Sequence, residues 1–165
     1  MYAEYRVKLN ICCWNVRTLL DRNSSKRPER RTALVTKELQ RLNVDIAALA
    51  ETRLAGEDQL IEVSSGFTIF WVGKPKTKRR EGGVGFAIRT SLLDRIKFPS
   101  SVNDRIMKMR MPLTHDRHAT LLSIYAPTLQ ASEDVLDSFY ECLRSTIATT
   151  PAGDKLLILG VLMPV

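Results

Sequence analysis

The sequence contains few cysteines, and they lack the spacing of a metal site. Cys12, Cys13 and Cys142 are the three cysteines, and no CxxC or Cys/His ligand pattern occurs. Neighbouring side chains of a strand point to opposite faces, so the adjacent Cys12 and Cys13 should not pair with each other. We therefore expect buried, reduced thiols of the kind that intracellular proteins carry.

Long hydrophobic runs are also absent. No N-terminal segment has the apolar length of a signal peptide, and none reaches the roughly 18 residues of a transmembrane helix. The sequence thus predicts a nuclear or cytoplasmic protein that is not secreted and has no membrane partner. It shows no internal repeat, and 165 residues suit one domain, which we place over residues 1–165.

Positive charge is what the sequence has in excess. The formal net charge is +7 and the pI is about 9.6, while 44% of the residues are hydrophobic and 26% are charged. The apolar content is typical of a folded domain and argues against disorder. The basic balance favours a polyanionic partner, nucleic acid ahead of an anionic membrane, although many basic proteins merely have basic surfaces.

The first fifty residues have the pattern of a strand, a helix and a second strand. Apolar residues 9–14 predict a buried strand that ends at Asn15, and residues 44–50 form a second apolar strand. Between them, helical spacing is shown by Leu34, Val35, Leu39 and Leu42. A crossover helix makes the two strands parallel, so Asn15 and Glu51 should meet at the carboxyl edge, where α/β folds bind ligands.

The remainder of the chain is rich in strand patterns. Antiparallel hairpins are predicted for residues 67–72, 83–88, 105–111 and 118–125. Ser132 opens an amphipathic helix, and residues 156–159 predict a last buried strand. The order of elements indicates an α/β fold with a mixed sheet flanked by helices.

Three polar residues follow predicted strands and are candidates for chemistry. Glu51 is held by rigid backbone, and Mg²⁺ needs only one or two protein carboxylates besides water and phosphate oxygens. Asn15 can orient a phosphate or a metal-bound water, and the Tyr125 hydroxyl can contact a phosphate. Each also has an ordinary interpretation: an ion pair with Arg53 for Glu51, a turn for Asn15 and a core edge for Tyr125.

A basic loop is the other candidate. It carries five positive charges, on Lys74, Lys76, Lys78, Arg79 and Arg80. Such a cluster can bind phosphates with salt-sensitive, sequence-independent affinity. The alternative is a solvated loop whose charges only keep it open.

Five short motifs, in order, resemble the endonuclease/exonuclease/phosphatase family. They are Cys13–Asn15, Leu49–Arg53, Gly82–Gly85, Asn103–Ile106 and Ser123–Pro127. Each motif is weak alone, but together they extend over nearly the whole chain. Within the family they most resemble the apurinic-type endonuclease domain of LINE-class retrotransposons. Arg17 supports that branch, because abasic-site repair relatives carry an additional acidic residue there.

The resemblance implies a four-layer α/β sandwich and Mg²⁺-dependent cleavage of phosphodiester bonds in DNA. By this analogy Glu51 binds the metal, Asn15 lies beside it, and Tyr125 contacts the scissile phosphate. Arg53 and Arg105 take the places of basic residues that contact the nucleic-acid backbone.

The C-terminal residues depart from the family pattern. Gly160 is followed by Val161, Leu162 and Met163 where the family has Gly-Asp-Phe-Asn, and its later Ser-Asp-His has no counterpart. We therefore expect an N-terminal portion of the domain, with most of the second sheet missing and the bare face of the first favouring self-association. Loss of a general base alone costs about 10²–10⁴ in rate, so catalysis should be impaired. The alternative is a non-enzymatic module that binds nucleic acid or protein, and a chain without a selected function is a third possibility.

Overall fold

Two β-sheets lie face to face in the structure, a computed structural model that describes residues 8–21 and 30–162. The first sheet contains β1 (Ile11–Asn15), β2 (Ile46–Ala50), β5 (Val84–Arg89), β4 (Phe67–Val72) and β3 (Glu57–Glu62), in that order. The second contains β6 (Lys97–Asn103), β7 (Ile106–Pro112), β8 (His118–Tyr125) and β9 (Lys155–Val161), in that order. The described helices are α1 (Arg31–Arg41), α2 (Glu133–Ala148) and the short 3₁₀ helix η1 (Thr90–Arg95).

The predicted strand–helix–strand unit is confirmed. Strands β1 and β2 are parallel, with Asn15 in register with Ala50, and α1 connects to β2 along the chain. All five residues of β2 are buried, which explains their uninterrupted apolar character. The parallel register brings Asn15 and the residue after β2, Glu51, to one edge of the sheet.

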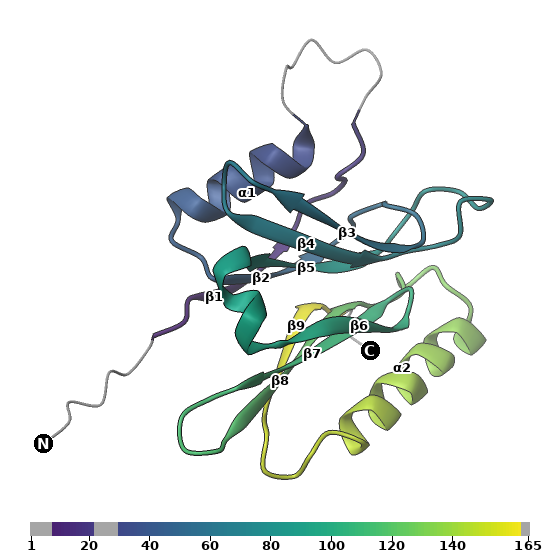
Figure 1. The fold of residues 1–165 in the computed structure, drawn as a ribbon. Helices are drawn as coiled ribbons and strands as arrows, with labels where there is room; N and C mark the ends of the chain where they lie inside the picture. Colours follow the sequence, from purple (N-terminus) through teal and green to yellow (C-terminus); the bar gives the residue numbers. More distant parts are fainter. Residues whose placement is uncertain (1–7, 22–29, 163–165) are drawn as a thin grey trace, which may run out of the picture.

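Helices α1 and α2 cover the outer faces of the first and second sheet respectively (Figure 1). On the first sheet, Leu39 of α1 belongs to one buried cluster with Leu49 and Phe67. On the second, Phe139 and Leu143 of α2 pack with Leu122. The hydroxyl of Ser132 accepts a hydrogen bond from the backbone N–H of Val135, which caps α2 where the sequence predicts its start.

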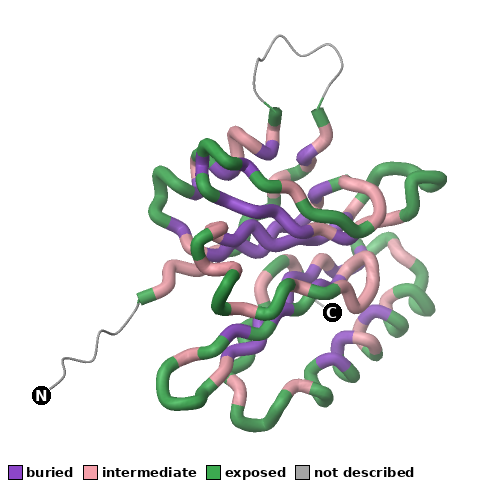
Figure 2. The backbone as a smooth tube through the Cα atoms, viewed as in Figure 1, coloured by how far each residue is buried: buried purple, intermediate pink, exposed green. Residues whose placement is uncertain are grey.

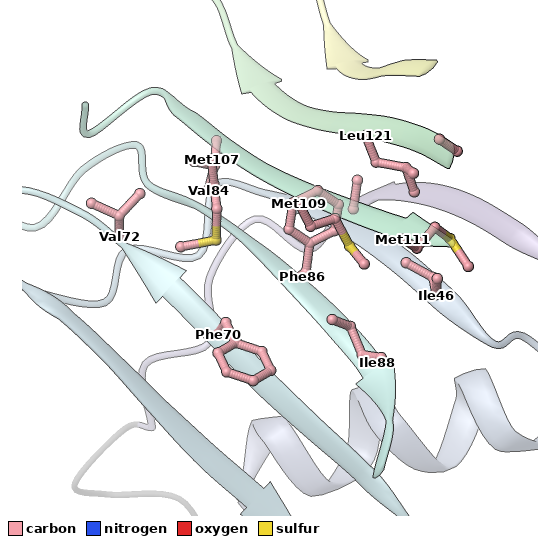
Figure 3. Packing of buried hydrophobic residues seen from close by; sticks show 12 residues of the cluster. Ile46, Phe70, Val72, Val84, Phe86, Ile88, Met107, Met109, Met111 and Leu121 are labelled. Atoms are coloured by element: carbon pink, nitrogen blue, oxygen red, sulfur yellow. The ribbon is translucent and has the colours of Figure 1, made fainter. Parts of the chain in front are cut away.

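The main core lies between the sheets (Figures 2 and 3). Phe86 and Ile88 of the first sheet share it with Met107, Met109 and Leu121 of the second. The layers are therefore helix, sheet, sheet and helix, and the predicted α/β sandwich class is confirmed. No described helix is long and apolar enough to cross a membrane.

One detail of the predicted sandwich is wrong. Four strands of the second sheet are present, and they cover the inner face of the first sheet, which was expected to be bare. Exposed apolar side chains lie instead on the edge strands β1 and β9, where Trp14 is 36% exposed and Leu157 is 38% exposed. Both strands were expected to be buried because their sequences are apolar. An apolar sequence does not show that a strand lies at the edge of its sheet and has a neighbour on one side only. Self-association itself stays a prediction.

The prediction of buried thiols is also wrong for β1. Cys13 is exposed and Cys12 only partly buried, although both are unpaired. Burial and the neighbouring thiol raise the pKa of Cys12. Edge position again explains the difference, since β1 has a strand on one side only.

Candidate active site

Three side chains from separate strands meet at one carboxylate. The phenol of Tyr125 donates a hydrogen bond of 2.7 Å to Oε1 of Glu51. The amide Nδ2 of Asn15 donates a second one, of 3.1 Å, to the same oxygen. Glu51 follows β2, Asn15 ends β1 and Tyr125 ends β8, so both sheets contribute to the cluster. The sequence prediction that Asn15 and Glu51 lie together agrees with this geometry.

The contacts that orient these side chains come from the backbone and the core. Oδ1 of Asn15 accepts a hydrogen bond of 3.0 Å from the backbone N–H of Arg17, which fixes the direction of its amide group. The buried hydroxyl of Ser123 donates across the sheets to the carbonyl of Leu49, at 3.3 Å. Ser123 lies two residues before Tyr125, and Leu49 lies two residues before Glu51. Their hydrogen bond joins β8 to β2 and so helps to set the distance between Tyr125 and Glu51.

Backbone strain accompanies the cluster. Glu51 has φ 56° and Arg53 has φ 57°, in the left-handed region where a residue with a Cβ is disfavoured. The backbone N–H of Arg53 donates to the carbonyl of Gly82 at 2.8 Å, which holds this conformation in place. Strain of about 1–3 kcal/mol per residue is characteristic of functional sites.

The Gly82–Gly83 turn lies against the same segment. Gly83 has φ +88°, and a Cβ there would lie 2.6 Å from Oγ1 of Thr52. Thr52 is fully buried, and its Oγ1 has no hydrogen-bond partner among the described residues. Glycine at position 83 is therefore required by both conformation and space.

The surroundings of Glu51 favour its ionised form. The hydrogen bond from Tyr125 is the largest cause that lowers the pKa of Glu51, followed by the bond from Asn15. The positive charges of Arg53 and Arg17 act in the same direction, while burial opposes them. The carboxylate is 21% exposed, with Nη2 of Arg53 at 4.0 Å. It is therefore negatively charged at neutral pH.

Tyr125 stays protonated under the same conditions. Burial and the bond to Glu51 raise the pKa of Tyr125 to about 12, although Arg105 and Arg53 oppose the shift. The Arg105 guanidinium lies 5.9 Å from the centre of the tyrosine ring and donates to the Tyr125 carbonyl at 3.1 Å. The site thus presents a hydroxyl donor whose position is fixed by a cation.

A pocket of about 270 Å³ opens beside this cluster. It is lined by Glu51, Arg53, Lys74, Glu81, Gly82, Gly83, Asp104, Arg105, Tyr125, Thr128 and Ala131. The lining has three cations and three carboxylates, so its formal charge is zero. Asn15 contacts Glu51 from outside this lining, and no histidine is among the described lining residues.

The basic loop divides into two parts. Lys74 lies in the pocket wall and forms an ion pair with Glu81, also in the wall. The other predicted phosphate-binding residues, Lys76, Lys78, Arg79 and Arg80, are exposed and do not line the pocket. The structure therefore brings one of the five cations to Glu51 and leaves four outside.

The donor atoms fit a Mg²⁺ ion that takes most of its ligands from elsewhere. Glu51 supplies the carboxylate, which Asn15 orients through its amide Nδ2. The described residues contain no group of three His, Cys, Asp or Glu that would form a protein cage. Mg²⁺ commonly binds through one or two carboxylates and completes its shell with water and substrate phosphates.

Several residues of the pocket were not predicted from the sequence to belong to the site. Glu81 and Asp104 supply two of its carboxylates, and Thr52 supplies a buried polar atom beneath it. Asp104 and the Gly82–Gly83 pair belong to the family motifs, so the motifs could have predicted that these residues lie at the site. Glu81 carries no such signal, because its position depends on how the loop closes.

Residues 12–160 match the Endonuclease/Exonuclease/phosphatase family. Craniofacial development protein 2 of Bos taurus, which the same motifs resemble, is 29% identical over 147 residues, covering 89% of this chain and 23% of its own length. The chain thus spans about a quarter of the length of that relative.

Solved structures share the fold. An AP endonuclease from Archaeoglobus fulgidus has a TM-score of 0.61 and 16% identity, over 93% of this chain and 56% of its own. TDP2 of D. rerio, complexed with a single-strand DNA product, has a TM-score of 0.57 and 15% identity, over 92% of this chain and 59% of its own.

Proposed function

The chain belongs to the endonuclease/exonuclease/phosphatase family, and from this premise we propose that the Glu51 pocket binds Mg²⁺ together with a phosphodiester of DNA. The single observation that carries the proposal is the junction of Asn15, Glu51 and Tyr125, whose hydrogen bonds meet at one carboxylate oxygen. Family membership alone gives the broad class, a nuclease-type hydrolase. The metal and the substrate belong to the proposal.

The charge of the pocket supports metal-dependent binding. With three cations and three carboxylates the lining is formally neutral, so it has little net attraction for a phosphodiester. A bound divalent cation would add two positive charges beside Glu51, which favours an anionic ligand. DNA affinity at this pocket should therefore rise with Mg²⁺.

Each side chain has a specific task in this proposal. Glu51 stays ionised and anchors the cation, and Asn15 orients the carboxylate. Tyr125 keeps its proton and would turn its single O–H from Glu51 to a phosphate oxygen when Mg²⁺ occupies the carboxylate, while Arg53 and Arg105 neutralise the DNA backbone. Bound Mg²⁺ supplies Lewis-acid polarisation of the phosphate.

Turnover by this chain should be slow. Hydrolysis needs a base that activates water, and no histidine lines the pocket among the described residues. Val161 follows Gly160 at the end of β9, where the family pattern has an aspartate, and residues 163–165 lie outside the described part. A retrotransposon origin is part of this proposal, and it is supported by Arg17, which takes the position of an acidic residue in abasic-site repair relatives.

The test measures DNA binding with and without Mg²⁺. Fluorescence anisotropy of a labelled DNA hairpin should show tighter binding in Mg²⁺ than in EDTA, and Glu51→Gln should remove this difference. We expect the variant to lose about tenfold or more in Mg²⁺ affinity. The matched control is Glu141→Gln, at a carboxylate that is 68% exposed on α2. Equal Mg²⁺ dependence in wild type and Glu51→Gln contradicts the proposal.

Non-enzymatic nucleic-acid binding is the second candidate, and the four exposed cations outside the pocket favour it. Replacing Lys76, Lys78, Arg79 and Arg80 by alanine should then reduce DNA affinity and its salt dependence. A supercoiled plasmid separates the two candidates, because only a nuclease produces Mg²⁺-dependent nicks that Glu51→Gln abolishes. Affinity and salt slope that do not change in the loop variant contradict the second candidate.

A further inference from the structure

The edge strands on the two sides of the sandwich differ in character. On one side β3 of the first sheet reaches β6 of the second, where the hydroxyl of Ser101 donates a hydrogen bond of 2.8 Å to Glu57. On the other side β1 of the first sheet contacts β9 of the second. Within the described part of the chain, each of these four strands has a neighbouring strand on one side only. Such an edge can pair with another chain unless its sequence prevents it.

The side formed by β3 and β6 is protected against such pairing. Strand β3 carries the carboxylates of Glu57, Asp58 and Glu62. Strand β6 contains Lys97 and Pro99, and its register with β7 is broken at two places. Charges, proline and irregular pairing are the means by which natural sheets keep their edges from joining.

The side formed by β1 and β9 lacks most of this protection. Strand β1 has the sequence Ile-Cys-Cys-Trp-Asn, and β9 has the sequence Lys-Leu-Leu-Ile-Leu-Gly-Val. Neither strand contains proline, and the one charged residue of the two is Lys155, at the start of β9. Three successive apolar residues of β9, Leu156, Leu157 and Ile158, are each 37–38% exposed. An uncharged apolar edge of this kind favours the addition of a strand.

The middle residue of β1 presents its backbone to the open edge. The N–H of Val16, one residue beyond β1, donates to the carbonyl of Ala50 in β2 at 3.1 Å. Backbone direction alternates along a strand, so the N–H and C=O of Cys13, three residues earlier, point away from β2. The side chain of Cys13 is exposed as well.

The middle residue of β9 has the same orientation in the second sheet. The carbonyl of Val161 accepts a hydrogen bond of 3.0 Å from the N–H of Ala126, which follows β8. The N–H and C=O of Ile158, three residues earlier, therefore point away from β8. Each open edge thus has its free backbone groups centred on the midpoint of the strand, as antiparallel pairing of a strand with itself requires.

A second copy of the chain fits both edges at once. A two-fold axis perpendicular to the stacked sheets makes each edge strand antiparallel to the same strand of the other copy. In β9 this axis pairs Ile158 with itself and Leu157 with Leu159. Lys155 lies opposite Val161, so no like charges meet although each copy carries a net charge of +7. A single foreign strand would cover one edge and leave the other open.

The same pairing extends the core. Leu157 is in register with Leu121, a core residue of β8, and Leu159 packs against the same core. Joining Leu157 of one copy to Leu159 of the other continues the apolar layer between the sheets into the second copy. The exposed side chains of β9 lose contact with water, which is the main favourable contribution to protein association.

We propose that this chain forms a two-fold dimer in which β9 pairs antiparallel with β9 of a second copy and β1 pairs with β1. Each sheet then continues from one copy into the other. No residue of β1 or β9 lines the Glu51 pocket, so the dimer does not depend on the proposed Mg²⁺ site.

Sedimentation velocity over a range of protein concentrations measures the association. We expect a dimer of twice the 18.7 kDa of the chain, in a proportion that falls on dilution. Ile158→Lys opposes two ammonium groups at the two-fold axis and should raise the dissociation constant of the dimer about tenfold or more. The matched control is Ile61→Lys on the protected strand β3, where the isoleucine is 52% exposed, and it should leave the constant unchanged. Urea unfolding checks that both variants are folded.

Disulfide formation tests the register of β1 without changing β9. The two copies of Cys13 form a hydrogen-bonded antiparallel pair in the dimer, with their Cα atoms about 5.5 Å apart, a distance that a disulfide can bridge. Mild oxidation should give a covalent dimer that Cys13→Ser abolishes and Cys12→Ser leaves intact.

The remaining outcomes overturn the proposal. A monomer at every concentration does so, including one that binds an added apolar strand peptide, because the occupant is then a foreign strand. Association that Ile158→Lys does not weaken, or that Ile61→Lys weakens equally, excludes β9 as the interface. Open-ended oligomers contradict the two-fold axis, and a covalent dimer that survives Cys13→Ser contradicts the register.

Discussion

The bond between Tyr125 and Glu51 should contribute measurably to stability. Hydrogen bonds to charged groups contribute about 1.5–3 kcal/mol, and the 2.7 Å bond ends on a carboxylate that is 21% exposed. We take the lower end, because partial exposure lets water replace the phenol, and expect a coupling energy of about 1.5 kcal/mol. A double-mutant cycle of Tyr125→Phe and Glu51→Gln isolates this energy from the other effects of each substitution.

Urea unfolding at pH 7, followed by the fluorescence of Trp14 and Trp71, supplies the four free energies of the cycle. The exposed pair Glu141 and Arg144, at 68% and 76% exposure, is a matched control and should couple by no more than about 0.5 kcal/mol. A coupling between Tyr125 and Glu51 that is as small as the control would refute the geometry of the site.

Three further predictions concern the turn, the site carboxylate and the ion pair of Arg110 with Asp154. Gly83→Ala should destabilise the fold by about 1–3 kcal/mol in urea unfolding, because its Cβ would clash with Thr52, whereas Gly82→Ala, whose Cβ meets nothing closer than 3.8 Å, should cost less. Because the folded pKa of Glu51 lies below its ordinary value of 4.5, more than half of the Mg²⁺-dependent binding should remain at pH 4.5 and be lost at lower pH; loss near pH 6 would contradict this. Hydrogen bonds from Arg110 and, to a smaller extent, Thr120 lower the pKa of Asp154 from 3.8 to about 2, so the Arg110–Asp154 pair stabilises above pH 3.8 and its contribution is lost as pH falls to about 2. Thermal unfolding of Arg110→Ala should accordingly differ from wild type at pH 7 and converge with it near pH 2.

The local and parallel parts of the fold could be predicted from the sequence. The helical spacing between two apolar strands was sufficient to place Asn15 and Glu51 at one sheet edge. Ser132 as a helix cap follows from its own side chain. These features depend on short-range chemistry, which a single sequence carries.

Features that depend on distant partners could not be predicted. The edge strand β3 is polar, with the pattern Glu-Asp-Gln-Leu-Ile-Glu, and gives no strand signal. Burial of β1 and β9 was overestimated, since an apolar strand sequence does not tell how many neighbours it has. The left-handed backbone of Glu51 is equally hidden, because it is imposed by contacts with the Gly82–Gly83 turn.

The central claim is that a divalent cation binds at Glu51, between Asn15 and Tyr125. Mn²⁺ replaces Mg²⁺ at oxygen-rich sites and broadens nearby NMR signals, so a titration of the ¹⁵N-labelled protein tests it directly. We predict that broadening begins at the amides around Asn15, Glu51 and Tyr125 and is abolished by Glu51→Gln. Broadening centred on another part of the molecule, or unaffected by that substitution, would contradict the account.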